Sequence, residues 1–378
     1  MIDPEAYPSW LTRDVRAVVT KVESVLAGQS DPIGKACAIH RIFAEMGFHA
    51  LLVPQDFGGR GGDHTSAGLA YELLSFELPG TLYGTLTTAH CSLMIMSGMN
   101  NDFHEDRLRM IARLGHPAAF CLTEQDAGSD ISAVRTRAEL EDGAYLISGS
   151  KSIAINHCIA DTLVVFAAVP PARGRAALSA FVLDAAIPGV LPKAPYPEPV
   201  LSGTVMGPVV FDNARVDADC LLGEPGSGYL LFMETLDKGR PLVAACCTGE
   251  AQRAFDIVLC HVRDRSQFQK VLFDFQDISF RLAELATRLK ASRLLWLDAL
   301  RRIDESRPFT LEASMSKLFA AETLTQMASF SLDAVGFRCV SRDIGQSAEL
   351  ERIWRDAQLL KIIDGAPAVQ RMVIASQI

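Results

Sequence analysis

The chain has 378 residues, of which 49% are hydrophobic and 21% charged, and its formal net charge is −9. A single hydrophobic core stops growing at roughly 250–300 residues, so this length predicts two or three domains. The acidic balance and the absence of a basic run argue against nucleic-acid binding, because a phosphate backbone requires clustered Lys and Arg.

The sequence also argues against a membrane or metal-dependent protein. No apolar run reaches the roughly 18 residues of a spanning helix, and the acidic N-terminal segment lacks signal-peptide features, which predicts a cytoplasmic protein. The nine Cys include no CxxC pair and are typical of reduced, buried side chains. The eight His form no HExxH motif and no cluster with Cys, so we predict no metal site.

Residues 1–116 are predicted to form a helical domain, because apolar residues recur three and four positions apart in segments such as 31–48 and 105–115. Between these segments, PQDFGGRGGD (54–63) is typical of a turn. It follows helical sequence and lacks GxGxxG spacing, so we do not interpret it as a dinucleotide-binding loop.

Residues 117–226 differ in composition from the preceding segment, and their pattern predicts an antiparallel β domain of barrel-like form. Short runs rich in Val, Ile, Leu and Phe alternate with Pro, Gly and Asp-Gly turn signals. The predicted strands cover 144–149, 162–169, 177–184 and 207–216. PPARGRA (170–176) is predicted to be an exposed turn between two of them.

Residues 227–378 are predicted to form a C-terminal four-helix bundle, with long helical patterns over 229–265, 277–305 and 310–335. In the second pattern the following residues lie near one face: Ile278, Leu282, Leu285, Leu289 and Leu295. The whole chain is therefore expected to adopt an α+β fold of three domains.

One segment, LTEQDAGSD (122–130), has the features of a ligand-binding loop after a strand. Thr123 can hydrogen-bond the edge of a planar ligand, Gly128 allows backbone to come close, and amides around Ser129 can hold an anion such as pyrophosphate. Taken by itself, the segment is more typical of an ordinary Asp- and Gly-rich turn, because such turns are common.

Four further motifs follow in the chain: GSKSIAIN (149–156), LDKGRP (236–241), RSQF with a later FQ (265–268 and 275–276), and RDA with a later IDG (355–357 and 363–365). In this order and at these spacings the five motifs resemble the acyl-CoA dehydrogenase family over roughly residues 40–375. The resemblance implies the family fold, with FAD between the β domain and the C-terminal bundle of a homodimer or homotetramer.

The resemblance also implies site residues. The positions that match cofactor contacts are Leu122, Thr123, Gly128, Ser129, Ile153, Ile155, Arg265, Phe268 and Gln276. Thr123 is expected at the flavin pyrimidine edge, whereas Arg265 and Gln276 are expected to reach the FAD of a neighbouring subunit. Substrate contacts are expected from Ser129, Asp237 and Arg240. A surface ion pair is the alternative interpretation of Arg240 and Arg265.

The family reaction needs a carboxylate that removes the proton next to a thioester carbonyl and a flavin that accepts hydride from the next carbon. The matching base is Asp364, where most of the family carries Glu. A misplacement of about 1 Å can cost on the order of 100-fold in rate, so the backbone or the substrate must sit differently. A family subset carries its base just before the Arg of LDxxR, where this chain has Gly239. A turn acid before Gly365 is the alternative interpretation.

Several positions depart from the usual family pattern. Ile153 and Ile155 stand where Trp and Thr usually lie beside the flavin, Ala366 replaces a Thr, and the usual glycine pair is not evident in 331–345. These departures are similar to enzymes of natural-product pathways, which act on acyl or aminoacyl groups tethered to carrier proteins. The KSxxxN segment resembles the prolyl type and GSDISAVRTR (128–137) the hydroxymalonyl type.

We therefore expect FAD-dependent α,β-dehydrogenation of a small acyl thioester on an acyl or peptidyl carrier protein, with a flavoprotein or oxygen as electron acceptor. Three alternatives remain open. The substrate is a free CoA ester; or the enzyme is a flavin oxidase or monooxygenase of the same fold, since nitroalkane oxidases use Asp at the position of Asp364; or the chain is a non-catalytic member.

Overall fold

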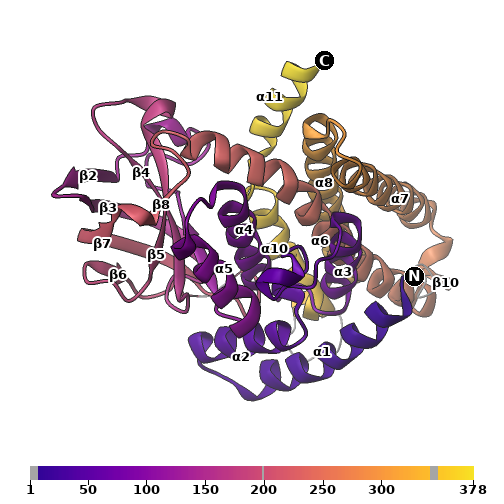
Figure 1. Cartoon of the computed structure of the whole chain (residues 1–378). Helices are drawn as coiled ribbons and strands as arrows, with labels where there is room; N and C mark the ends of the chain where they lie inside the picture. Colours follow the sequence, from indigo (N-terminus) through magenta and orange to yellow (C-terminus); the bar gives the residue numbers. More distant parts are fainter. Residues whose placement is uncertain (1–6, 198–199, 341–347) are drawn as a thin grey trace.

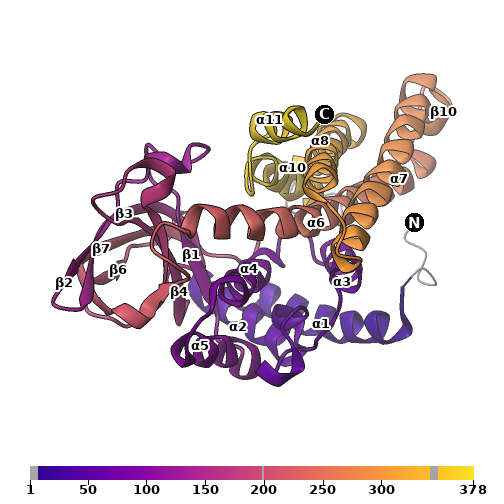
Figure 2. The same cartoon turned by 45° about the horizontal axis from the view of Figure 1, so that its top comes forward.

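The computed structural model describes residues 7–197, 200–340 and 348–378. A β sheet occupies one side of the molecule, and helices from both ends of the chain form the other side (Figure 1). The long helix α6 (Gly228–Asp264) runs from the sheet into the helical part, and α4 (Tyr83–Gly98) lies beside it (Figure 2). These two helices therefore connect the two halves.

The N-terminal region is helical, as the periodicity predicts. Besides α4 it contains α1 (Ser9–Gly28), α2 (Pro32–Glu45), α3 (His64–Glu77) and α5 (Asp102–Leu114). The start of α2 shows why the sequence forms a helix there: the Asp31 carboxylate accepts a hydrogen bond of 2.7 Å from the amide of Gly34, and Pro32 occupies the first turn. In α4, every residue from Tyr83 to Ile95 is buried, which places this helix in the interior.

The middle region is an eight-stranded sheet in which β6, β7, β3, β2, β4, β5 and β8 are neighbours in that order. Its strands are β1 (Ala118–Cys121), β2 (Arg137–Glu141), β3 (Ala144–Ile155), β4 (Thr162–Ala168), β5 (Leu178–Asp184), β6 (Val190–Pro192), β7 (Met206–Asp217) and β8 (Leu221–Leu222). The turn 170–176 lies between β4 and β5, as predicted. Most strand pairs are antiparallel, as expected, but β1 pairs parallel with β4 after a connection through β2 and β3.

The C-terminal region is helical again, with a short hairpin after α6. It contains β9 (Ser266–Gln267), β10 (Lys270–Val271), α7 (Gln276–Asp304), α8 (Thr310–Val335), α9 (Phe337–Val340), α10 (Ala348–Leu360) and α11 (Pro367–Gln377). Helix α8 packs against α6, α7, α10 and α11. Leu282, Leu285 and Leu289 of α7 are buried as expected, but farther along Trp296 takes the buried position and Leu295 is half-buried.

Three hydrophobic clusters organise the interior. One joins the N-terminal helices to α6, α7, α8 and α10, a second fills the sheet, and a third packs α4, α5 and the first turns of α6 against one face of the sheet. The junction between sheet and bundle is thus built by α4 and α6. Among the described residues, no helix is both long and apolar enough to span a bilayer.

Candidate active site

Charged residues of the first two motifs, Glu124 and Lys151, form a buried scaffold. The Glu124 carboxylate accepts hydrogen bonds from Lys151 Nζ (2.7 Å), the Arg135 amide (2.7 Å), the Thr136 amide (3.0 Å) and the Thr136 hydroxyl (2.6 Å). Lys151 is 0% exposed and also donates to the Leu122 carbonyl at 3.1 Å. Burial opposes ionisation of Glu124, but Lys151 and these donors outweigh it and lower its pKa.

A second scaffold contact comes from Asn156 at the end of β3. Its side-chain amide donates to the Gly84 carbonyl at 2.7 Å and to the Ala118 carbonyl at 3.0 Å. Since Gly84 lies on α4 and Ala118 on β1, Asn156 ties the sheet to the helix that borders the junction. The polar residues of GSKSIAIN therefore build the site rather than line it.

The residues predicted to contact the flavin lie around this scaffold. The Thr123 carbonyl accepts the Ser152 amide at 2.9 Å, which brings the 122–130 loop beside β3. Ile153 and Ile155 pack against the helical cluster, whereas Ala154 between them packs inside the sheet. Leu122 is buried, Thr123 is half-buried, and Gly128 and Ser129 are exposed. The structure thus brings Thr123, Ile153 and Ile155 together at the junction.

The LDKGRP motif lies within α6 and supplies a buried ion pair. Arg240 is 1% exposed and donates to Asp237 and, at 3.3 Å, to the Ser314 hydroxyl. Asp237 also accepts the Thr310 hydroxyl at 2.8 Å. Burial raises the pKa of Asp237, although Arg240 opposes that shift. The surface ion pair considered for Arg240 is therefore wrong, because the pair is enclosed by α6 and α8.

Asp364 lies in the turn between α10 and α11, and its side chain is only 8% exposed. Its backbone carbonyl accepts hydrogen bonds from Gln370 Nε2 (3.0 Å) and Arg240 Nε (3.4 Å). Lys317 Nζ donates to the carbonyls of Lys361 and Gly365, both at 2.9 Å. Three side chains thus hold the backbone of the turn. Neither carboxylate oxygen of Asp364 accepts a hydrogen bond from the described residues, and Oδ2 is fully buried.

The structure adds one residue that the sequence analysis missed. His90 of α4 is buried, and its Nδ1 lies 3.9 Å from Asp364 Oδ2. A methyl group added at Gly239 would lie 2.5 Å from His90 Nε2, so the ring fills the space beside that glycine. An ionisable His in the middle of a helix without Asp, Glu, Lys or Arg was the available signal, but no motif marks it.

Arg265, Phe268 and Gln276 lie away from the junction. They belong to the β9–β10 hairpin and its flanks, at the far end of α6 from the sheet (Figure 2). All three are exposed, and Phe268 is 88% exposed at the tip of the hairpin. Within one chain they cannot join Thr123 or Asp364. Of the segment in which a glycine pair was sought, residues 341–345 lie outside the described residues.

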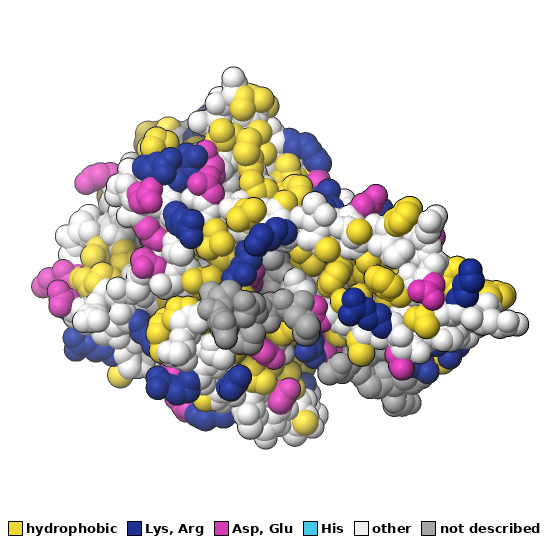
Figure 3. Space-filling model, turned by 90° about the vertical axis from the view of Figure 1, so that its right-hand side faces the viewer, with side chains coloured by type: hydrophobic (Ala, Val, Ile, Leu, Met, Phe, Trp, Pro, Cys, Tyr) yellow, Lys and Arg dark blue, Asp and Glu magenta, His cyan; other side chains and the backbone are white. Residues whose placement is uncertain are grey.

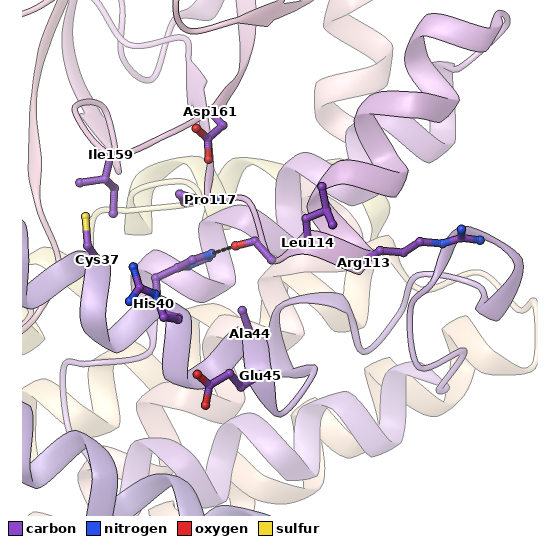
Figure 4. Close-up of a pocket in the computed structure, with 11 residues that line it drawn as sticks. Cys37, His40, Ala44, Glu45, Arg113, Leu114, Pro117, Ile159 and Asp161 are labelled. Carbon is purple, nitrogen blue, oxygen red and sulfur yellow. Dashed lines mark hydrogen bonds between the residues drawn. The ribbon is translucent and has the colours of Figure 1, made fainter.

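A separate surface hollow of about 420 Å³ lies between α2, the end of α5 and the start of β1 (Figure 4). His40 Nε2 donates a hydrogen bond of 3.1 Å to the Gly115 carbonyl there, and Arg113 and Asp161 border the hollow. None of the predicted cofactor or substrate residues lines this hollow, so we place the active site at the junction instead.

Comparison with known proteins matches two family descriptions to the chain: "Acyl-CoA dehydrogenase, middle domain" over residues 119–214, and "Acyl-CoA dehydrogenase, C-terminal domain" over residues 226–378. The chain belongs to the acyl-CoA dehydrogenase family. It is accordingly an oxidoreductase that acts on CH–CH groups, and its cofactor is FAD.

Named relatives agree with this assignment. The chain is 32% identical to a probable acyl-CoA dehydrogenase of Bacillus subtilis, over 88% of this chain and 87% of that protein. It is 31% identical to a 3-(aryl)acrylate reductase of Clostridium sporogenes, over 89% and 88%. Butyryl-CoA dehydrogenase from Megasphaera elsdenii has the same fold, with a TM-score of 0.89, 27% identity and 98% of both chains covered.

The residues of this acyl-CoA dehydrogenase fit a flavin at the junction. Half-buried Ile153 and Ile155 offer an apolar surface there, and the Thr123 hydroxyl has no hydrogen-bond partner among the described residues. A methyl group added at Gly128 would meet no atom within 4 Å, so the loop has open space beside it. Thr123, Ile153, Ile155 and Ser129 are the residues of this chain that would hold FAD.

Proposed function

We propose that this acyl-CoA dehydrogenase uses Asp364 as the base that removes the proton next to the carbonyl of a small acyl thioester. The observation that carries the proposal is a carboxylate that is nearly buried yet has an oxygen, Oδ2, without a partner. Buried polar atoms are normally hydrogen-bonded, and a catalytic role is one physical reason for an exception. FAD, when bound, supplies the acceptor for the hydride from the adjacent carbon.

The surrounding side chains support this role because they hold the turn without neutralising the carboxylate. Arg240, Gln370 and Lys317 all donate to backbone carbonyls of residues 361–365. Asp364 has a left-handed backbone (φ 54°), which is unusual for a residue other than Gly and needs such support. The donors thus fix the direction of a side chain that is one methylene shorter than the usual Glu.

We infer further that the thioester is carried by an acyl or peptidyl carrier protein. Support comes from the departures at Ile153 and Ile155 and from the 128–137 segment, which resemble carrier-dependent members of the family. Ile155 lacks the hydroxyl that most of the family places near the flavin, which is expected to alter reactivity towards a flavoprotein or oxygen as electron acceptor. A free CoA ester is the competing substrate.

A second copy of the chain is proposed to complete each FAD site. Figure 3 looks onto the side that carries α7 and the hairpin, where hydrophobic side chains gather. Phe268, Phe280 and Leu294 are exposed large hydrophobic residues of these elements. Arg265 and Gln276 lie in the same region and would reach the partner's cofactor in a homodimer or homotetramer.

The test is anaerobic bleaching of the bound flavin by a panel of thioesters. Small acyl groups on a carrier protein are compared with the same groups on CoA, and Asp364→Asn serves as the matched variant. We expect bleaching by carrier-bound esters in the wild type and none in the variant. Preference for long-chain acyl-CoA would contradict the carrier proposal.

Other outcomes of this experiment identify the alternatives. Turnover under air that is unchanged in Asp364→Asn would point to oxygenation chemistry and overturn the role of Asp364. Peroxide release under air would identify an oxidase. Purified protein without flavin colour would favour a non-catalytic member.

A further inference from the structure

His90 lies deep in the molecule with a nitrogen that nothing in the described residues satisfies. It is 4% exposed, and its Nε2 has no hydrogen-bond partner. Burying an imidazole without partners costs free energy, so such a residue calls for a reason. The nearest carboxylate is Asp364, whose Oδ2 is also buried and unpartnered, 3.9 Å from His90 Nδ1.

The absence of a side chain at Gly239 leaves room for the His90 imidazole. A side chain at position 239 would begin 2.5 Å from His90 Nε2, a separation that real Cβ atoms do not show. Gly239 and His90 come from α6 and α4, the two helices that border the junction. The position at which an alternative base would stand is therefore filled by the His90 ring, and the two residues form a matched pair.

The protonation state of His90 suits a hydrogen-bond donor. Burial lowers its pKa, and the charge of Asp364 offsets only part of that effect, so the imidazole is neutral at neutral pH. A neutral imidazole carries one N–H, and the unpartnered acceptor beside Nδ1 favours the tautomer with the proton on that nitrogen. A shift of about 1 Å would close a hydrogen bond, as catalytic contacts commonly do when substrate binds.

We propose that His90 is a positioning residue for Asp364, with its Nδ1–H bonded to Oδ2 so that Oδ1 is aimed at the substrate carbon. The inference rests on the proposed function of Asp364. When the C–H bond breaks, its proton forms an O–H bond on Asp364 and the electron pair stays on the thioester as the enolate. His90 keeps its own proton throughout.

Other charged groups also face Asp364 and must be separated from His90 in any pH measurement. Arg240 and Asp237 face it from α6, and Lys317 from α8, while the neutral Gln370 does so from α11. Burial lowers the pKa of Lys317 to about 8. Its titration affects the alkaline side of a profile. Burial raises the pKa of Asp237, which titrates on the acidic side, so the change of the acidic limb between wild type and His90→Phe is the readout.

The experiment compares three variants of the FAD-loaded enzyme. His90→Phe keeps the ring shape without a donor, His90→Asn keeps a donor near the position of Nδ1, and Gly239→Ala displaces the ring while leaving His90 in the sequence. Turnover of the active thioester gives kcat, KM and the pH profile, and the rate at which the substrate α-proton exchanges with deuterated water reports Asp364 directly.

We expect kcat to fall about 10- to 100-fold in His90→Phe and Gly239→Ala, with KM changed by less than about threefold. The acidic limb of kcat should move to higher pH in His90→Phe, because the ionised carboxylate loses a hydrogen bond. His90→Asn should recover most of kcat and the wild-type limb.

Equal kcat and an unmoved acidic limb in His90→Phe would overturn the inference while leaving Asp364 as the base, provided that Asp364→Asn abolishes exchange. Exchange that persists in Asp364→Asn would instead overturn the proposed function itself. If His90→Phe fails to bind FAD, the kcat of His90→Asn is compared with the kcat of Gly239→Ala. A kcat of His90→Asn no higher than that of Gly239→Ala would contradict the inference.

Discussion

Two buried carboxylates near the junction of sheet and bundle differ in their hydrogen bonding. Glu124 accepts four hydrogen bonds and faces the Lys151 ammonium, so its charge is fully compensated. Asp364 accepts none on its carboxylate from the described residues, although Arg240 and Lys317 are close. Those cations donate to backbone carbonyls instead. Glu124, whose oxygens are all hydrogen-bonded, serves as scaffold, whereas Asp364, proposed as the base, has lone pairs free to accept a substrate proton.

The largest expected effect comes from removing the Lys151 ammonium that pairs with the scaffold acid Glu124. Lys151→Met leaves Glu124 as a buried charge without its cation, which should lower the free energy of unfolding by about 3–5 kcal/mol. Urea denaturation at neutral pH measures it. Lys21→Met, which removes an exposed pair with Glu45, is the control and should cost less than about 1 kcal/mol. A similar small loss in both variants would show that Glu124 needs no partner.

The next prediction concerns Asp364, the carboxylate without hydrogen bonds. Asp364→Glu restores the acid that most of the family carries, but in a turn whose backbone suits the shorter side chain. We expect kcat to fall about 10- to 100-fold, because the carboxylate would be misplaced by about 1 Å. The change should leave the unfolding free energy within about 1.5 kcal/mol. A faster Asp364→Glu enzyme would mean that the turn does not set the reach of the base.

A third buried acid sharpens the comparison through pH. The Glu250 carboxylate accepts a hydrogen bond from the Gly80 amide. Its pKa is raised well above 4.5, mainly by burial and also by the nearby charge of Asp356. Burial likewise raises the pKa of Asp356 to about 6. The folded protein then holds more protons than the unfolded chain, so stability falls as pH rises through these values. Glu250→Gln removes that loss. Its stability relative to wild type should grow as pH rises above about 4.5, as measured in parallel urea titrations. Parallel pH curves would contradict it.

The smallest effect concerns the substrate side of the junction. Thr310→Val removes the hydroxyl that donates to Asp237 and leaves the ion pair with Arg240 in place. Loss of one such bond costs about 1 kcal/mol, so KM should rise about fivefold while kcat stays the same. Steady-state kinetics on the active thioester measures this. A fall in kcat with constant KM would place Asp237 in the chemistry rather than in binding.

Local patterns predicted the elements better than the contacts between them. The helix over 310–335 follows from its periodicity and was confirmed to the residue as α8. The parallel pairing of β1 with β4 depends on where a four-residue strand lies in three dimensions, which its own sequence does not encode.

The candidate site shows the same limit. Glu124 and Lys151 belong to separate motifs, and their contact across 27 positions appears only after folding. Asp364 was marked by its motif because the turn residue Gly365 follows it. His90 has no motif, and its meeting with Asp364 and Gly239 joins α4, α6 and the α10–α11 turn. The family resemblance therefore indicated Asp364, whereas its neighbour His90 could be identified only from the packing of the helices.

The most direct test of Asp364 as the base is the exchange of the substrate α-proton with deuterated water, followed by NMR in the wild type and Asp364→Asn. Both proteins are loaded with FAD and checked for equal flavin content. We predict that the substitution slows exchange by about 1,000-fold, the scale expected for loss of a general base. Exchange within tenfold of the wild-type rate would contradict the account.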